Sequence, residues 1–124
     1  MRFMVLMIPA VYQREVQDGF APPADAVAEM GKFNQRLQDA GVLRSLDGLH
    51  PPTRAKSARV TFTAKGKPVV TDGPFAETRE VLGGYWIIEV ASREAAIEWM
   101  RQCPAEPGDT LEIRQIFEAS DFAQ

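Results

Sequence analysis

The sequence has very few of the residues from which disulfides and metal sites are built. Among its 124 residues there is one cysteine, Cys103, and one histidine, His50. A single cysteine cannot form an internal disulfide, and one Cys and one His among scattered carboxylates lack the spacing of a metal site. The lack of disulfides favours a reducing compartment. We therefore expect a cytoplasmic protein that holds no metal.

Long hydrophobic runs and basic clusters are also missing. The apolar run near the N-terminus covers only residues 3–8. That run is too short for a signal peptide and far below the roughly 20 residues that a membrane span needs. The basic residues are scattered in a chain whose net charge is −3, which offers little for the neutralisation of phosphates. We expect binding to neither a membrane nor a nucleic acid.

The overall composition, with 45% hydrophobic and 25% charged residues, is typical of one globular domain over residues 1–124. Hydrophobic periodicity divides the chain into strands of period two and helices of period 3.6. In chain order we expect a strand at 2–9, a helix at 23–40, a strand at 42–49, a hairpin of strands 58–65 and 68–71, a strand at 85–90, a helix from the Ser92 cap to Cys103, and a strand at 110–117.

This order predicts an α+β fold of the ferredoxin-like type, in which two helices cover one face of an antiparallel sheet. The strands at 2–9 and 85–90 are apolar on both faces, although the helices can cover only one. A large apolar face does not stay in water. We therefore expect a homodimer that packs sheet against sheet, with a cleft for a small organic ligand between the sheet and its partner.

The stretch TDGPFAET at residues 71–78 has more turn residues than one turn needs. In a structural interpretation, Asp72 caps amides, Gly73 and Pro74 set the turn, and Phe75 fills an apolar hole. In a functional interpretation, Asp72 faces the cleft as a general base, and its pKa rises if it is desolvated but falls if it caps amides. Phe75, Glu77 and Arg79 then help to bind the substrate.

Two further residues are candidates for the cleft. His50 lies in a loop before two prolines and could serve as an acid or base near neutral pH, although an exposed loop position explains it equally well. Tyr85 and Trp86 point to opposite faces of one strand, so one faces the helices and the other faces the dimer side. There Trp86 could stack on a planar ligand, or it could belong to the core.

Residues 70–90, VTDGPFAETREVLGGYWIIEV, resemble the signature of the DGPF proteins, a branch of the YCII-related family. FMVLMI, LQDAGVL, GLHPP and EWMRQCP agree with the resemblance, which covers nearly the whole chain. It implies a dimeric α/β barrel of ferredoxin-like subunits. Relatives in the wider superfamily act on small, often aromatic, compounds, and some accompany or are fused to sigma factors, which leaves open a role beside transcription regulators.

In the YCII branch, a histidine on the first helix and an aspartate are the proposed active pair. The first helix expected here, at 23–40, contains no histidine, so that base has no counterpart in this sequence. Two hypotheses follow. The first is a cofactor-free lyase or isomerase in which Asp72 and His50 are catalytic and Phe75, Glu77, Arg79 and Trp86 bind the substrate. The second is a non-catalytic module that binds a ligand or partner, with a purely structural DGPF turn.

Overall fold

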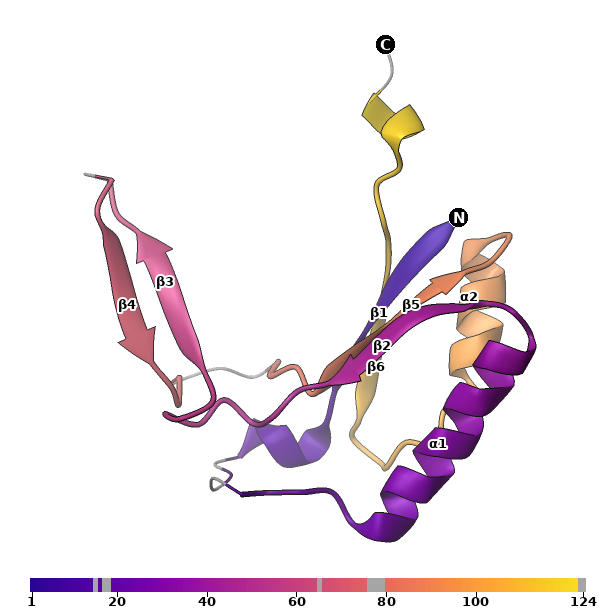
Figure 1. Ribbon diagram of the computed structural model, residues 1–124, viewed down its shortest axis with the longest axis horizontal. Coiled ribbons are helices and arrows are strands. Elements are labelled where there is room, and N and C mark those ends of the chain that lie inside the picture. The colour runs from indigo at the N-terminus through magenta and orange to yellow at the C-terminus, as the bar shows by residue number, and fades with distance from the viewer. Residues whose placement is uncertain (15, 17–18, 65, 76–79, 123–124) are drawn as a thin grey trace.

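The computed structural model describes residues 1–14, 16, 19–64, 66–75 and 80–122 (Figure 1). Its elements follow one another in this order: β1 (Arg2–Ile8), η1 (Ala10–Gln13), α1 (Ala24–Asp39), β2 (Leu43–Gly48), β3 (Ala58–Phe62), β4 (Pro68–Asp72), β5 (Gly84–Glu89), α2 (Arg93–Met100), β6 (Thr110–Gln115) and η2 (Ala119–Phe122). The predicted strands and helices are all present, and within residues 10–22, expected as a loop, the 3-10 helix η1 forms.

The main sheet has four strands in the order β2-β5-β1-β6, and all three pairings are antiparallel. Both α-helices lie on the same side of this sheet (Figure 1). This arrangement confirms the predicted ferredoxin-like α+β fold, in which the two central strands come from different halves of the chain.

Local sequence signals explain where the helices begin and end. At the end of α1, Gly41 has a φ of 74°. Its N–H donates to the Gln38 carbonyl and the Val42 N–H donates to the Leu37 carbonyl, which is the Schellman pattern. At the start of α2 the Ser92 hydroxyl accepts a 3.1 Å hydrogen bond from the Ala95 N–H, as its expected role of N-cap requires.

The core lies between the helices and the sheet. Phe33 and Leu37 of α1 are fully buried there, and they pack with Val5 of β1 and Ile88 of β5. Val27 was expected on the same buried face, but it is exposed because the first turn of α1 projects beyond the core.

The alternation of β1 and β5 separates the two faces of the sheet as predicted. Phe3, Val5 and Trp86 belong to the core, whereas Met4, Leu6, Tyr85 and Ile87 are only partly buried. These four partly buried residues define the open face, the side of the sheet that faces away from the helices. Near the edge of this face, the Tyr85 hydroxyl donates a 3.1 Å hydrogen bond to Asp47 Oδ2.

The hairpin of β3 and β4 forms a separate two-stranded sheet that extends away from the main body (Figure 1). Residues 58–65 were expected to form a half-buried strand, and this expectation was wrong. All five residues of β3 and all five of β4 are exposed. The alternation does place apolar residues on one face of the hairpin, but none of the helices and strands that the structure describes covers that face.

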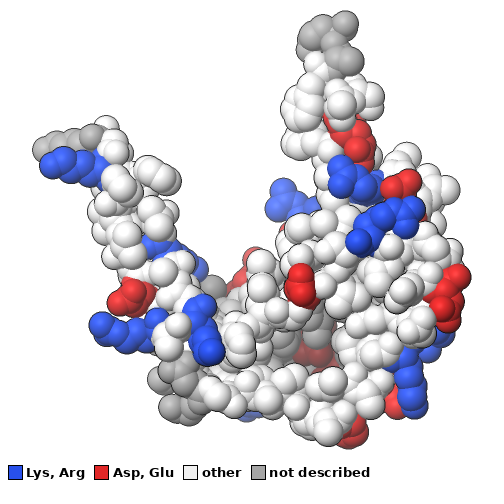
Figure 2. All heavy atoms as spheres, in the orientation of Figure 1, with Lys and Arg blue, Asp and Glu red and all other residues white. Residues whose placement is uncertain are grey.

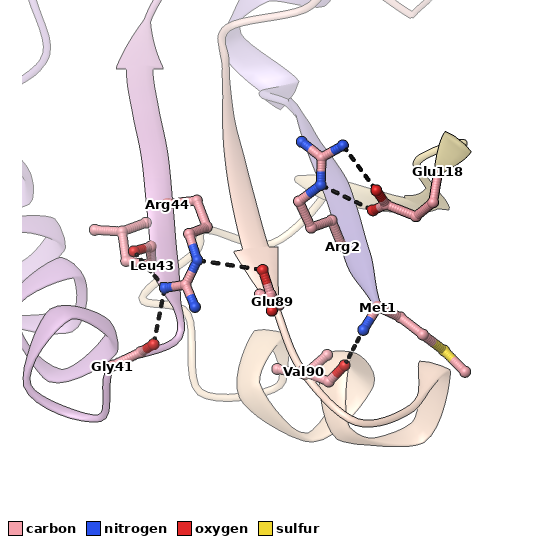
Figure 3. A network of polar contacts seen from close by, with 8 residues as sticks. All are labelled: Met1, Arg2, Gly41, Leu43, Arg44, Glu89, Val90 and Glu118. Carbon is pink, nitrogen blue, oxygen red and sulfur yellow. Dashed lines mark hydrogen bonds and ion pairs between the residues drawn. The ribbon is translucent and has the colours of Figure 1, made fainter. Parts of the chain in front are cut away.

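Two ion pairs connect strands of the main sheet to their neighbours, Arg2 with Glu118 and Arg44 with Glu89 (Figure 3). The Arg2 guanidinium of β1 donates two hydrogen bonds, of 2.8 and 3.2 Å, to the Glu118 carboxylate. These bonds hold the base of the C-terminal segment, residues 116–122, against β1. Arg44 of β2 lies 3.4 Å from Glu89 of β5 and also donates to the carbonyl of Gly41. Beyond its base the C-terminal segment extends away from the body (Figure 1). None of the described helices is both long and apolar enough to cross a membrane.

Candidate functional site

The chain leaves the main sheet after β2 and returns to it before β5, and these two crossing points are tied together. The Leu49 N–H donates a 2.9 Å hydrogen bond to the Gly83 carbonyl, and the Gly83 N–H donates 2.8 Å to the Met7 carbonyl. The Tyr12 hydroxyl donates 2.8 Å to the Leu49 carbonyl. The segment between residues 49 and 83 therefore begins and ends at one fixed place on the body.

The loop that leads into the hairpin is held by its own hydrogen bonds. The Thr53 N–H donates 2.7 Å to the Pro51 carbonyl, and the Ser57 hydroxyl donates 2.6 Å to the Thr53 carbonyl. Thr53 is buried although it is polar. Because prolines 51 and 52 also restrict the backbone, this loop is a firm base for β3.

Gly73 of the DGPF turn packs directly against this loop. A Cβ atom at Gly73 would collide with Ser57 Oγ and the Pro52 carbonyl oxygen, so only glycine allows the two segments to approach this closely. Gly73 is buried, and its N–H faces the Ser57 carbonyl at 3.5 Å. This contact gives the glycine of the motif a structural task that its sequence alone does not reveal.

Asp72, the first candidate for a catalytic base, lies at the end of β4. Its side chain is 53% exposed, and Oδ2 lies 3.6 Å from an Nη of Arg54. Neither environment considered from the sequence, a desolvated carboxylate or one that caps amides, describes this geometry. A solvated ion pair of this kind contributes little to stability.

A hollow of about 510 Å³ opens at the base of the hairpin, between residues 49–59 on one side and residues 75 and 80–82 on the other. His50, Lys56, Arg59, Phe75 and Glu80 line it, together with apolar neighbours that include Leu49 and Leu82. The Arg59 guanidinium lies over the Phe75 ring, 4.0 Å from its centroid. We call this space the arm-root hollow.

The charges of the arm-root hollow are unequal. Lys56 and Arg59 line it with His50, against the single described acid Glu80. Since clefts lined by one sign of charge concentrate ions of the opposite sign, this hollow favours an anion. In the described part of the chain, no three His, Cys, Asp or Glu side chains gather as metal ligands.

The remaining predicted site residues lie in different places. His50 and Phe75 line the arm-root hollow, while Glu77 and Arg79 fall outside the residues that the structure describes. Trp86 is buried against α1, where its ring meets that of Phe33 edge-on at 6.1 Å and its Nε1 donates 2.7 Å to Asn34 Oδ1. Trp86 also lines a second, smaller hollow of about 150 Å³ between α1 and the sheet.

Sequence reasoning missed Arg59 and Lys56. Both were passed over as polar positions of an alternating strand and its approach. The signal that could have identified them is their charge, since residues 54–59 hold three basic residues in a chain whose net charge is −3. The proximity of Arg59 to Phe75, 16 positions further along, could not be read from either segment alone.

Comparison with known proteins agrees with this architecture. The sequence profile of the YCII-related domain matches residues 1–120. One curated relative, an uncharacterized protein of Rhizobium meliloti (strain 1021), is 34% identical over 73 residues. That match covers 59% of this chain and 56% of the relative, so the chain spans little more than half the length of the relative it resembles.

Proposed function

Given that the chain belongs to the YCII-related family, we propose that it is a homodimeric binding protein whose ligand is a small organic anion held in the arm-root hollow. The observation that carries this proposal is the Arg59 guanidinium over the Phe75 ring, in a hollow that Lys56 and His50 also line. A guanidinium offers a fork of N–H donors that matches a carboxylate in geometry and charge.

The hollow has the mixed character that small-molecule sites require. Leu49, Leu82 and Phe75 supply apolar surface, and the charged groups at the rim supply orientation. In this proposal the DGPF turn is structural. Gly73 allows the turn to pack closely against the 51–57 loop, and the Phe75 ring packs against the Arg59 guanidinium.

The homodimer rests on the open face. Met4, Leu6, Tyr85 and Ile87 remain partly exposed on the two central strands, on the side of the sheet away from α1 and α2. Two copies that meet by two-fold symmetry bury this strip twice in one step. Sedimentation at micromolar concentration tests this part, and a stable single subunit contradicts it.

A second candidate, a cofactor-free lyase or isomerase, is favoured by one observation. His50 and Glu80 line the same hollow, so an anion bound at Arg59 has one imidazole and one carboxylate within the same space. In this candidate His50 takes the leading role in proton transfer. Asp72 contributes through its pair with Arg54 at the base of the hairpin.

The binding proposal is tested with a panel of aliphatic and aromatic carboxylates, each paired with its neutral amide. We expect the carboxylates, but not the amides, to shift NMR signals of residues 49–59. Arg59→Gln should weaken carboxylate binding about tenfold, or about 1.4 kcal/mol. Arg93→Gln is the matched control, because Arg93 pairs with Glu94 on the exposed side of α2. Equal shifts from acids and amides contradict the proposal.

Asp72→Asn separates the two candidates, since it keeps the shape of the side chain and removes its charge. If the DGPF turn is structural, this variant binds carboxylates normally. If Asp72 takes part in chemistry, the variant folds and dimerises but no longer transforms the ligand, as does His50→Gln. Turnover that survives both substitutions contradicts the catalytic roles of Asp72 and His50, and a wild-type protein that binds carboxylates without transforming any of them contradicts the enzyme candidate.

A further inference from the structure

Residues 54–72, which comprise the approach to β3, β3 itself, the turn and β4, form an arm that stands away from the body (Figures 1 and 2). Every residue of its two strands is exposed. An isolated two-stranded hairpin is marginally stable in water. The arm therefore needs a packing surface, and the described part of its own chain does not provide one.

One face of the arm is apolar. Val60 pairs with Val70 and Phe62 pairs with Pro68, so these four side chains lie on the same side of the hairpin. The pair Ala58 and Asp72, at the base of the arm, lies on that side as well. Phe62 is 74% exposed and Val70 is 66% exposed. The opposite side carries Arg59 and the threonines 61 and 71 with Val69. An apolar strip of this kind on an otherwise polar arm marks a docking surface.

The arm also differs from the body in charge. Residues 54–72 contain five of the 14 basic residues and one of the 17 acidic ones, which gives a net charge of +4. The rest of the chain has a net charge of −7. Figure 2 shows Lys and Arg side chains along the arm and acidic side chains distributed over the body. The surface that best complements a basic, apolar arm is acidic and apolar, and the body of this chain has both properties.

The matching surface lies beside the open face, which the proposed dimer already covers sheet against sheet. There the C-terminal segment exposes Phe117 and Phe122, whose rings contact each other at 5.0 Å. The same segment contains two acids, Glu118 and Asp121, and no basic residue.

We propose that the arm docks on a second copy of this chain, with Val60, Phe62 and Val70 against that copy's C-terminal phenylalanines, Phe117 and Phe122. The inference rests on the proposed dimer and extends it, because two-fold symmetry lets each arm clasp the other copy in the same way. Nucleic acid fits the basic charge of the arm but leaves its apolar face in water, so a protein surface is the better occupant.

Docking of the arm also completes the arm-root hollow. Arg59 lies on β3 and Phe75 lies just after β4, so the wall of the hollow is part of the arm. A second copy that holds the arm in place holds these two residues in place as well. Ligand binding and association of the two copies are then coupled, and each strengthens the other.

The test uses the full chain with p-benzoylphenylalanine in place of Phe62, a conservative change at an exposed aromatic position. Irradiation should give an adduct of twice the subunit mass, in which the attached peptide comes from residues 110–122 of an isotopically labelled second copy. The same photoreactive residue at Thr61, on the opposite face of β3, is the control and should give far less of this adduct.

Each other outcome decides the question. A dimer by sedimentation with only intrachain adducts, or with none, overturns arm docking but leaves the proposed dimer intact. A monomer overturns both, and an adduct with nucleic acid or with another protein in a cell extract overturns the choice of occupant. Independently, Phe62→Ser should raise the dimer Kd about tenfold or more, whereas Thr61→Ser should leave it unchanged. Equal dimer Kd values for the two variants contradict the proposal.

Discussion

Trp86 Nε1 donates a 2.7 Å hydrogen bond to Asn34 Oδ1, which joins the centre of the sheet to the middle of α1. Trp86→Phe removes the donor and leaves the amide oxygen of Asn34 facing a space that the smaller ring does not fill. We expect a loss of about 1–3 kcal/mol in the free energy of unfolding, measured by urea denaturation. Carboxylate binding at Arg59 should not change.

Tyr85→Phe, on the adjacent residue, is the control for Trp86. The Tyr85 hydroxyl donates to Asp47 of β2 on the exposed side of the sheet. The loss of this hydrogen bond should therefore lower the free energy of unfolding much less than Trp86→Phe does. If Trp86→Phe instead abolishes ligand binding while stability is kept, Trp86 is a ligand contact, as the sequence-based prediction allows.

Gly73→Ala should destabilise the fold. The added methyl group meets Ser57 Oγ and the Pro52 carbonyl, and the second of these belongs to a backbone that prolines restrict. We expect a cost of about 1–3 kcal/mol, the usual effect of overpacking, visible as a lower midpoint in urea.

Gly31→Ala is the matched control, since a Cβ atom at Gly31 meets nothing within 4 Å and the residue lies inside α1. It should stabilise the protein by up to about 1 kcal/mol, because alanine has the higher helix propensity. A Gly73→Ala variant as stable as the wild type means that the DGPF turn does not depend on close packing with the 51–57 loop.

Cys103 should react slowly with alkylating reagents. Burial, with a further contribution from the charge of Asp109, raises the pKa of the Cys103 thiol to about 11. The thiolate is the reactive form, so iodoacetamide labelling of the folded protein should increase between pH 9 and 11, whereas urea-unfolded protein should react from about pH 8.5.

The same difference in pKa has a consequence for stability. Because the fold favours the neutral thiol, the contribution of Cys103 to the free energy of unfolding is fully present below pH 9 and declines as the pH rises towards 11. Cys103→Ala should remove this alkaline decline. Rapid labelling of the folded protein at pH 8 contradicts the burial of the thiol.

Glu118→Gln should release the C-terminal segment without unfolding the domain. The hydrogen bond from Arg2, together with its charge, holds the pKa of the Glu118 carboxyl below its usual value. Its contribution is therefore present above about pH 4.3 and is lost as the pH falls through the lowered folded value. The Ile116 N–H donates to the Arg2 carbonyl, and its protection factor, the intrinsic amide exchange rate divided by the observed rate, should fall in the variant and in wild type at low pH.

Glu29→Gln is a suitable control, because Glu29 pairs with Lys32 on the exposed side of α1. The midpoint of unfolding should change little for either variant, as these pairs are exposed to solvent. Unchanged exchange at Ile116 in Glu118→Gln shows that the ion pair does not anchor the segment.

Much of the fold could be read from the sequence, because the signals for it are local. The short run at residues 2–9, apolar on both faces, predicted the central strand β1, and Ser92 marked the start of α2. The site could be read less well. His50 and Phe75 were candidates and they line one hollow, whereas Asp72 lies outside its lining, next to Arg54.

The sequence by itself determined the order of the elements and the period of each, since backbone hydrogen bonding and side-chain direction depend on residues a few positions apart. Only the tertiary structure decided that Trp86 rather than Tyr85 faces the helices, that Gly73 presses on Ser57, and that Arg59 lies over Phe75. A strand pattern states that two faces differ but not which neighbour each one meets. That choice depends on the path of the whole chain, because the contacts join segments that are distant in sequence.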